Sequence, residues 1–286
     1  MPTIAIVSPG FMGAALGWAL RRGGARVVAT AAGRSPRTRR LAGEAGIELL
    51  PALADVVAAA DVVLSVTPPG EAVAAARSID AAVRAADVRP VLADLNAVAP
   101  ATMTAIARTW ADLPVADGSI SGPPPTVSPG ARLYLSGPGA GAVADLPWGD
   151  YVRPVVLDAG VGAASALKMC TASVYKGLNG LVTQAMRVAG RHGVLDEVLA
   201  DLAQNGLDRS AGVPSAATKA ARFVDEMREI AVTQAAAGLT PSLFEAFAEV
   251  YADIAATDLA AGDPETAGPP PAPDEMVRRL APARRS

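Results

Sequence analysis

The stretch TIAIVSPGFMGAALGWAL, from Thr3 to Leu20, decides the fold. A short apolar run leads into a turn that contains Gly10 and Gly13, and the turn leads into an Ala- and Leu-rich helix. The two glycines stand where the second and third glycines of G-x-G-x-x-G let a backbone approach a pyrophosphate, while Ser8 replaces the first. A tight strand-to-helix turn without a ligand is the alternative. We expect the turn to bind a dinucleotide through Ser8, Pro9, Gly10, Phe11, Met12 and Gly13.

The same alternation of apolar runs and helical segments continues along the first half of the chain. Further runs rich in Val, Ile and Leu lie at 25–30, 61–67, 90–96 and 115–120, and helical segments lie at 37–46, 70–86 and 99–112. This order is typical of βαβ units around a parallel sheet that is buried on both faces. ARLYLSG and YVRPVVL end the pattern as two more strands. The fold class is therefore α/β, with a Rossmann-type doubly wound parallel sheet in residues 1–158.

The second half changes to helical periodicity. Apolar residues recur every three or four positions in 160–192, 195–206, 215–238 and 241–259, which predicts an all-α C-terminal domain in residues 159–262. In the first of these segments we expect one stripe to face the core: Leu167, Val174, Leu178, Leu181, Ala185 and Val188. Residues 263–286 are rich in Pro and charge, so a flexible tail is expected there, at least through Pro273.

The end of the second strand predicts which dinucleotide binds. NAD-binding domains usually carry an acid there for the ribose 2′-hydroxyl, but TAAGRSPRTRR has no acid before Glu44. Arginine pairs well with a 2′-phosphate, so we predict NADP(H) as the cofactor, bound by Arg34, Ser35 and Arg37. For Arg39 and Arg40 a solvated helix face explains the sequence equally well.

Composition excludes several classes of function. The chain has 286 residues, one cysteine, one histidine and a net charge of −3. Neither an internal disulfide, a His-rich metal site nor Ser-His-Asp catalysis is expected, and nothing indicates a nucleic-acid partner. Without an 18-residue apolar run or a secretory signal, neither a membrane segment nor export is expected, so we predict a cytoplasmic protein.

Four further stretches carry a resemblance to a known family: SVTPP at 65–69, DLNAVAP at 94–100, DGSISG at 117–122 and GVGAASALK at 160–168. In order and spacing they resemble the β-hydroxyacid dehydrogenase superfamily, which includes 6-phosphogluconate and 3-hydroxyisobutyrate dehydrogenases. The similarity reaches to about Leu259 and is greatest to a branch called phosphogluconate-dehydrogenase-like. True 6-phosphogluconate dehydrogenase has a much longer second domain.

The resemblance implies roles for single residues. Thr67 and Pro68 would line the cofactor site, and Asn96 would lie near the nicotinamide ribose. Ser121 and Gly122 would hold the substrate, typically by its carboxylate. Lys168 falls on the catalytic lysine of the family. Helical domains of this superfamily commonly pair, which implies a homodimer.

The chemistry of Lys168 agrees with that role. Only three lysines occur among 25 basic residues, and an ammonium can give a proton to a carbonyl oxygen whereas a guanidinium cannot. A lysine that snorkels along a helix surface is the alternative. Lys176, two helical turns further on, would bind the anionic group of the substrate, lower the pKa of Lys168, or lie on the surface.

Two departures from the family pattern leave the substrate open. Ala172 stands where the family usually has Asn, and FVDEMREIA at 223–231 places Arg228 where a lysine normally approaches the cofactor. A helical pair of Asp225 with Arg228 explains the second departure without function. We predict an NADP(H)-dependent oxidoreductase acting on a small hydroxyacid or ketoacid. An imine reductase and a non-catalytic NADP(H) sensor or scaffold are the alternatives.

Overall fold

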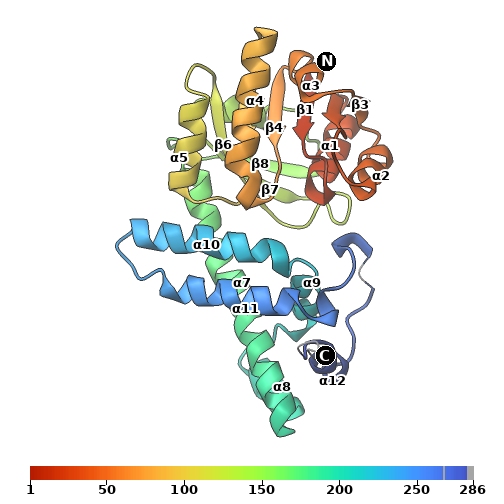
Figure 1. The fold of residues 1–286 in the computed structure, drawn as a ribbon, viewed down its shortest axis with the longest axis vertical. Coiled ribbons are helices and arrows are strands. Elements are labelled where there is room, and N and C mark those ends of the chain that lie inside the picture. The colour runs from red at the N-terminus through yellow and green to blue at the C-terminus, as the bar shows by residue number, and fades with distance from the viewer. Residues whose placement is uncertain (267, 282–286) are drawn as a thin grey trace. The chain divides into compact units, whose positions relative to one another are not determined.

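The computed structural model describes residues 1–266 and 268–281, and it divides into two compact units, Met1–Met169 and Cys170–Ser286. The chain passes from one unit to the other within the long helix α7 (Ala163–His192), labelled in Figure 1. The division falls after the predicted position, residue 158, because the first turn of α7 is hydrogen-bonded to the sheet through Asp117 and Ser136.

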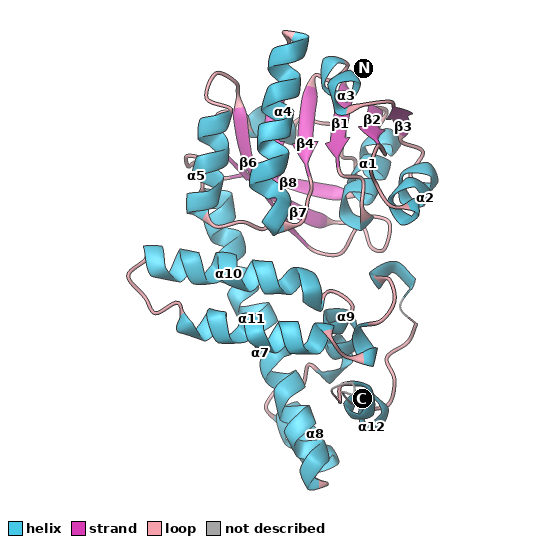
Figure 2. Cartoon of the chain, viewed as in Figure 1, coloured by secondary structure: helices cyan, strands magenta, loops and turns pink. Residues whose placement is uncertain are grey.

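The first unit is built on an eight-stranded sheet in the order β3-β2-β1-β4-β5-β6-β7-β8 (Figure 2). Its strands are β1 (Thr3–Val7), β2 (Arg26–Thr30), β3 (Glu48–Leu50), β4 (Val62–Ser65), β5 (Val91–Asp94), β6 (Val115–Ser121), β7 (Ala131–Ser136) and β8 (Val152–Val156). The first six strands are parallel, β7 is antiparallel to β6, and β8 is parallel to β7. The order 3-2-1-4-5-6 is that of a Rossmann sheet, so the predicted fold class is confirmed.

Helices cover both faces of this sheet. They are α1 (Phe11–Arg22), α2 (Pro36–Glu44), α3 (Leu53–Ala58), the 3-10 turn η1 (Pro69–Glu71), α4 (Ala72–Ala86), α5 (Pro100–Thr109) and α6 (Ala140–Ala144). Ile4 and Ile6 of β1 pack with α1, α2 and α6, whereas Ala5 and Val7 pack with α3, α4 and α5. Because successive side chains of a strand point to opposite faces, β1 has to be apolar throughout.

The second unit is helical, as predicted. Besides most of α7 it contains α8 (Leu195–Gln204), the 3-10 turn η2 (Ser210–Gly212), α9 (Val213–Ala217), α10 (Ala220–Ala236), α11 (Ser242–Ala255), the 3-10 turns η3 (Asp258–Ala260) and η4 (Pro264–Thr266), and α12 (Pro273–Arg279). Helices α10 and α11 pack side by side (Figure 1). The Phe223 and Tyr251 rings meet edge to face between them, with centroids 5.2 Å apart.

The predicted core face of α7 is wrong. Val174, Leu181 and Val188 are each 57% exposed. The buried face of the helix instead carries small or flexible side chains: Met169, Ala172, Val182, Met186 and Ala189. The reason is close packing, since a Cβ on Gly180 would lie only 2.9 Å from the Phe247 ring of α11.

The expected tail also differs from the structure. Residues 273–279 form α12, and Met276 and Leu280 are buried one helical turn apart. Helix α12 packs closely on α7 at Gly190, where an added Cβ would lie only 2.6 Å from the Val277 side chain. Residues 267 and 282–286 of the tail lie outside the described residues. None of the helices described is both long enough and apolar enough to cross a membrane.

Candidate cofactor and catalytic site

The turn after β1 has the geometry expected of a dinucleotide turn. A Cβ on Gly13 would lie 2.6 Å from the Ser8 carbonyl oxygen, so only glycine fits. Gly10 has open space on its Cβ side, and no side chain caps the N-terminus of α1. Amide groups at such a helix end attract an anion. Ser8 itself adopts a φ of +68°, a left-handed conformation in the position of the first glycine.

A cavity of about 360 Å³ lies beside this turn, at the carboxyl ends of β1 and β2. It is lined by Ile6, Val7, Ser8, Thr30, Ala32, Arg34, Ala52, Leu53, Val56, Thr67, Pro68, Glu71, Ala74, Ala75 and Ser78. In an open parallel sheet, ligands bind where the strand order reverses, which here is between β1 and β4. The buried Thr67 Oγ1 has no hydrogen-bond partner within the described chain, as expected of a wall that a ligand completes.

The arginines after β2 have different surroundings. Arg34 lines the cavity, whereas Arg37, in the first turn of α2, does not. Ser35 is the N-cap of α2, and its Oγ accepts from the Thr38 amide at 3.2 Å. Arg40 forms a 3.0 Å ion pair with Glu44 one turn along the helix. Arg34 is therefore the arginine placed to contact a group bound in the cavity.

A buried polar network joins β5 to the loop after β4. Asn96 Nδ2 donates to Asp94 Oδ2 at 2.7 Å and to Ser65 Oγ at 3.2 Å. Asn96 Oδ1 accepts from the Thr67 amide at 2.6 Å. Burial raises the pKa of Asp94 to about 7, against hydrogen bonds from Asn96 that lower it. Asn96 is only 3% exposed, and through the Thr67 amide it holds a residue that lines the cavity.

A second buried carboxylate fixes the start of α7. Asp117 of β6 is fully buried and accepts from the amides of Gly162 and Ser165, at 2.8 and 3.1 Å, and from the hydroxyls of Ser165 and Ser136, at 2.7 and 3.1 Å. A carboxylate at a helix N-terminus is favourable for the helix dipole as well. Sequence reasoning missed Asp94 and Asp117. The available signal was a charged residue inside each of two apolar strands.

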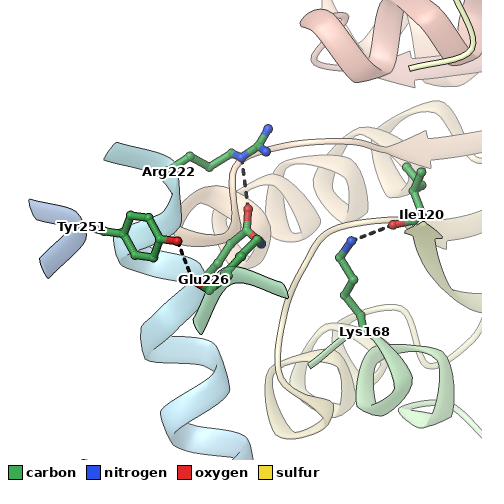
Figure 3. A network of polar contacts seen from close by, with 6 residues as sticks. Ile120, Lys168, Arg222, Glu226 and Tyr251 are labelled. Carbon is green, nitrogen blue, oxygen red and sulfur yellow. Dashed lines mark hydrogen bonds and ion pairs between the residues drawn. The ribbon is translucent and has the colours of Figure 1, made fainter. Parts of the chain in front are cut away.

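Lys168 lies one turn further along α7, within the first unit. Its Nζ donates to the Ile120 carbonyl at 2.7 Å (Figure 3). Ile120 directly precedes Ser121 and Gly122, and Gly122 has a φ of +134°, which favours glycine. The structure therefore brings the predicted lysine to the end of β6 that carries the predicted substrate residues.

The second unit holds the remaining predicted site residues in ion pairs. Lys176 is paired with Glu226, whose side chain is 4% exposed. Arg222 Nε lies 3.1 Å from the other oxygen of Glu226 (Figure 3). Arg228 is 66% exposed and pairs with Asp225 at 3.1 Å, which is the helical pairing expected as the alternative. Sequence reasoning missed Glu226, although it lies within the quoted segment 223–231.

Within residues 1–266 and 268–281, no three or more His, Cys, Asp and Glu side chains gather in a way that could hold a metal ion. The ionisable groups that the site brings together are Lys168, the buried Asp94 and Asp117, and Arg34 and Glu71 of the cavity wall.

Two sequence comparisons match parts of the chain. Residues 189–254 match the family described as a domain of unknown function, DUF1932. An uncharacterized 28.5 kDa protein in the 7S RNA 5′ region of Methanothermus fervidus is 27% identical over 168 residues, or 58% of this chain. The match spans 63% of the length of that protein.

Solved structures match nearly the whole chain. The conserved protein MTH1747 of unknown function, described as similar to 3-hydroxyacid dehydrogenases, is 25% identical with a TM-score of 0.65, covering 88% of this chain and 96% of its own. The 3-hydroxyisobutyrate dehydrogenase of Mycobacterium tuberculosis, solved with L-serine, gives 20% identity and a TM-score of 0.70 over 98% and 99% of the two chains. An imine reductase of Streptomyces aurantiacus is 18% identical with a TM-score of 0.56, and the match covers 97% of this chain and 99% of that one.

Proposed function

Because the chain has the fold of the 3-hydroxyacid dehydrogenases, and its resemblance to that superfamily is confirmed, we propose that it is an NADP(H)-dependent oxidoreductase. Its substrate would be a small hydroxyacid or ketoacid, held at Ser121 and Gly122. The observation that carries the proposal is the contact of Lys168 with the carbonyl that precedes those two residues.

The residues of the cavity fit a dinucleotide with a 2′-phosphate. The open turn at Gly10 and the uncapped start of α1 suit a pyrophosphate. Thr30, at the end of β2, is neutral and would not repel a phosphate as an acid would. Arg34 supplies the positive charge. When bound, the nicotinamide gives or takes the hydride of the reaction.

Lys168 moves the proton. In the reductive direction its ammonium gives a proton to the carbonyl oxygen of the substrate, which becomes the hydroxyl of the product, and Lys168 is left as a neutral amine. In the oxidative direction the neutral amine takes the hydroxyl proton. Reduction starts from the ammonium, and an ammonium suits the hydrogen bond that Nζ donates to the Ile120 carbonyl. This supports reduction as the direction that the protein favours.

The experiment replaces Lys168 by Met, which keeps the length of the side chain and removes the exchangeable proton. We expect turnover to fall by roughly 10²- to 10⁴-fold while NADPH binding is retained. Lys219→Met is the control, because Lys219 belongs to the second unit and bonds to Ser215 there. Turnover by Lys168→Met equal to that of the unchanged protein would refute the catalytic role.

Imine reduction is the second candidate, supported by the shared fold of the imine reductase from S. aurantiacus. It needs the same hydride and one proton, but imine reductases usually have Asp or Tyr where this chain has Lys168. A panel of ketoacids, hydroxyacids and cyclic imines, followed by NADPH absorbance, separates the two. Binding of NADPH without turnover of any compound would favour a sensor or scaffold.

A homodimer completes the proposal. The exposed stripe of Val174, Leu181 and Val188 on α7 is the observation that supports it, because three apolar side chains seven residues apart form one continuous face. Substrate binding by Lys176 and cofactor binding by Arg228 stay predictions. In the structure Lys176 is paired with Glu226, and Arg228 with Asp225.

A further inference from the structure

Four residues, Asp94, Asn96, Ser65 and Thr67, link strand β5 to the wall of the cofactor cavity. The Asp94 carboxylate accepts from the Asn96 backbone amide at 3.0 Å through Oδ1 and from the Asn96 side chain at 2.7 Å through Oδ2. The second hydrogen of that side chain goes to Ser65, and its oxygen receives the Thr67 amide. Both amide hydrogens of Asn96 are thereby used, so the side chain has a single orientation.

Thr67, the last residue in this series of hydrogen bonds, lines the cavity. Thr67 and Pro68 line it, and the Thr67 hydroxyl is buried without a partner in the described residues. The side-chain oxygen of Asn96 holds the backbone amide of Thr67. The position of that hydroxyl toward a ligand therefore depends on the orientation of the Asn96 amide.

Resting on the proposed function, we propose that Asp94 is a positioning residue: its carboxylate fixes the Asn96 amide, the amide holds Thr67 for the nicotinamide cofactor, and protonation of Asp94 weakens cofactor binding. A carboxylate offers only acceptors to the two Asn96 donors. A proton on Oδ2 would face the Asn96 Nδ2 hydrogen, donor against donor. If the amide turned over to relieve this, its nitrogen would face the Thr67 amide, and the loop would lose its hydrogen bond.

The surroundings of Asp94 place this change near neutral pH. The pKa of the carboxyl is raised to about 7: burial raises it most and the negative charge of Asp117 on the neighbouring strand also raises it, while hydrogen bonds from Asn96 and Ser65 oppose both. Asp117 is the one other charged group that acts on Asp94 from the elements around it in the described structure. Conditions one pH unit to either side of 7 should thus populate different states of the loop.

The test measures the Kd of NADPH for the full chain by NADPH fluorescence at pH 6, 7 and 8. If binding requires the ionised carboxylate, the Kd at pH 6 is about tenfold higher than at pH 8. Asp94→Asn, which imitates the protonated acid, should bind weakly at all three values. Any change of the Kd with pH that this variant keeps comes from the 2′-phosphate of NADPH, whose second pKa is about 6. Asp145→Asn, an exposed carboxylate after α6, is the matched control and should keep the full pH dependence.

The outcomes separate this inference from the proposed function. If the unchanged chain does not bind NADPH at any of the three pH values, the proposed function fails. If it binds NADPH and the profile of Asp94→Asn superimposes on its own, the function stands and the positioning role is wrong. Should Asp94→Asn not fold by circular dichroism, Asn96→Ala provides the second variant. It is expected to bind weakly and to keep only the change between pH 6 and pH 8 that comes from the 2′-phosphate of NADPH, and binding equal to that of the unchanged chain would overturn the inference.

Discussion

Arg34 is the residue on which cofactor choice depends in our proposal. It lines the cavity next to the end of β2, and no acid precedes Glu44 there. Charge-assisted hydrogen bonds contribute about 1.5–3 kcal/mol each, so Arg34→Glu should raise the Kd of NADPH by roughly 10- to 100-fold and leave that of NADH nearly unchanged. Arg39→Glu, on the exposed side of α2, is the control. Equal losses for both cofactors, or none, would show that Arg34 does not contact a 2′-phosphate.

Asp94 also links stability to pH. Its pKa is about 7 in the folded protein, compared with 3.8 as the ordinary value. Between about pH 4 and pH 7 the native state therefore holds a proton that the unfolded state has lost, and the free energy of unfolding falls as pH rises through this window. Asp94→Asn lacks this titration. The free energy of unfolding of the variant, measured by urea denaturation, should therefore be higher relative to that of the unchanged chain at pH 8 than at pH 5. A constant difference between the two proteins would contradict the assigned pKa.

Residues in the site were predicted unevenly from sequence. Gly10, Gly13 and Arg34 could be singled out from local patterns, and Lys168 from the family resemblance together with the chemistry of lysine; their roles stay predictions. Asp94, Asp117 and Glu226 depend on partners that are distant in sequence: the Asp117 carboxylate, for instance, binds the Ser165 amide 48 residues away. A single sequence shows such a carboxylate only as a charge within an apolar segment.

At the scale of elements, the N-terminus of α7 connects fold to chemistry. Asp117 holds the start of α7 to the sheet by three hydrogen bonds, and Lys168 follows one turn later. Asp117→Asn would set an amide donor against donors that are already present. We expect a loss of about 2–4 kcal/mol in the free energy of unfolding, measured by urea denaturation, because buried donors are left unpaired. Asp112→Asn, at an exposed position after α5, should change it by less than about 0.5 kcal/mol. A similar small change for Asp117→Asn would show that the carboxylate does not anchor the helix.

Prediction of the elements succeeded where the apolar pattern is long. The five longest strands of the parallel sheet and the four main helical segments of the second unit were predicted at about their observed positions. Strand β3 and helix α3 were missed, because three and six residues are too few to show a period. The core face of α7 was wrong for a different reason. Periodicity detects an apolar stripe, but it does not tell which face a neighbouring helix covers, and here α11 packs on the glycine side.

At the scale of the whole molecule, the exposed face of α7 raises the question of what covers it. Val174, Leu181 and Val188 are each 57% exposed, on a face where polar residues would be expected of a monomer. A second copy of the chain would cover the stripe with the same stripe, since a two-fold interface places one surface against itself. Full burial of a Val or Leu side chain contributes about 1.5–3 kcal/mol, and two copies would bury six of them.

Leu181→Glu tests the dimer directly. It would place two carboxylates in the centre of the paired stripes, and desolvating them costs more than the remaining apolar contacts return. We expect the unchanged chain to have the mass of a dimer by light scattering after size exclusion, and Leu181→Glu to have that of a monomer with an unchanged circular dichroism spectrum. Gln204→Glu adds the same charge at an exposed position at the end of α8, away from the stripe, and should stay dimeric. A monomeric unchanged chain at micromolar concentration, or a dimer that survives Leu181→Glu, would mean that something other than a second copy covers this helix.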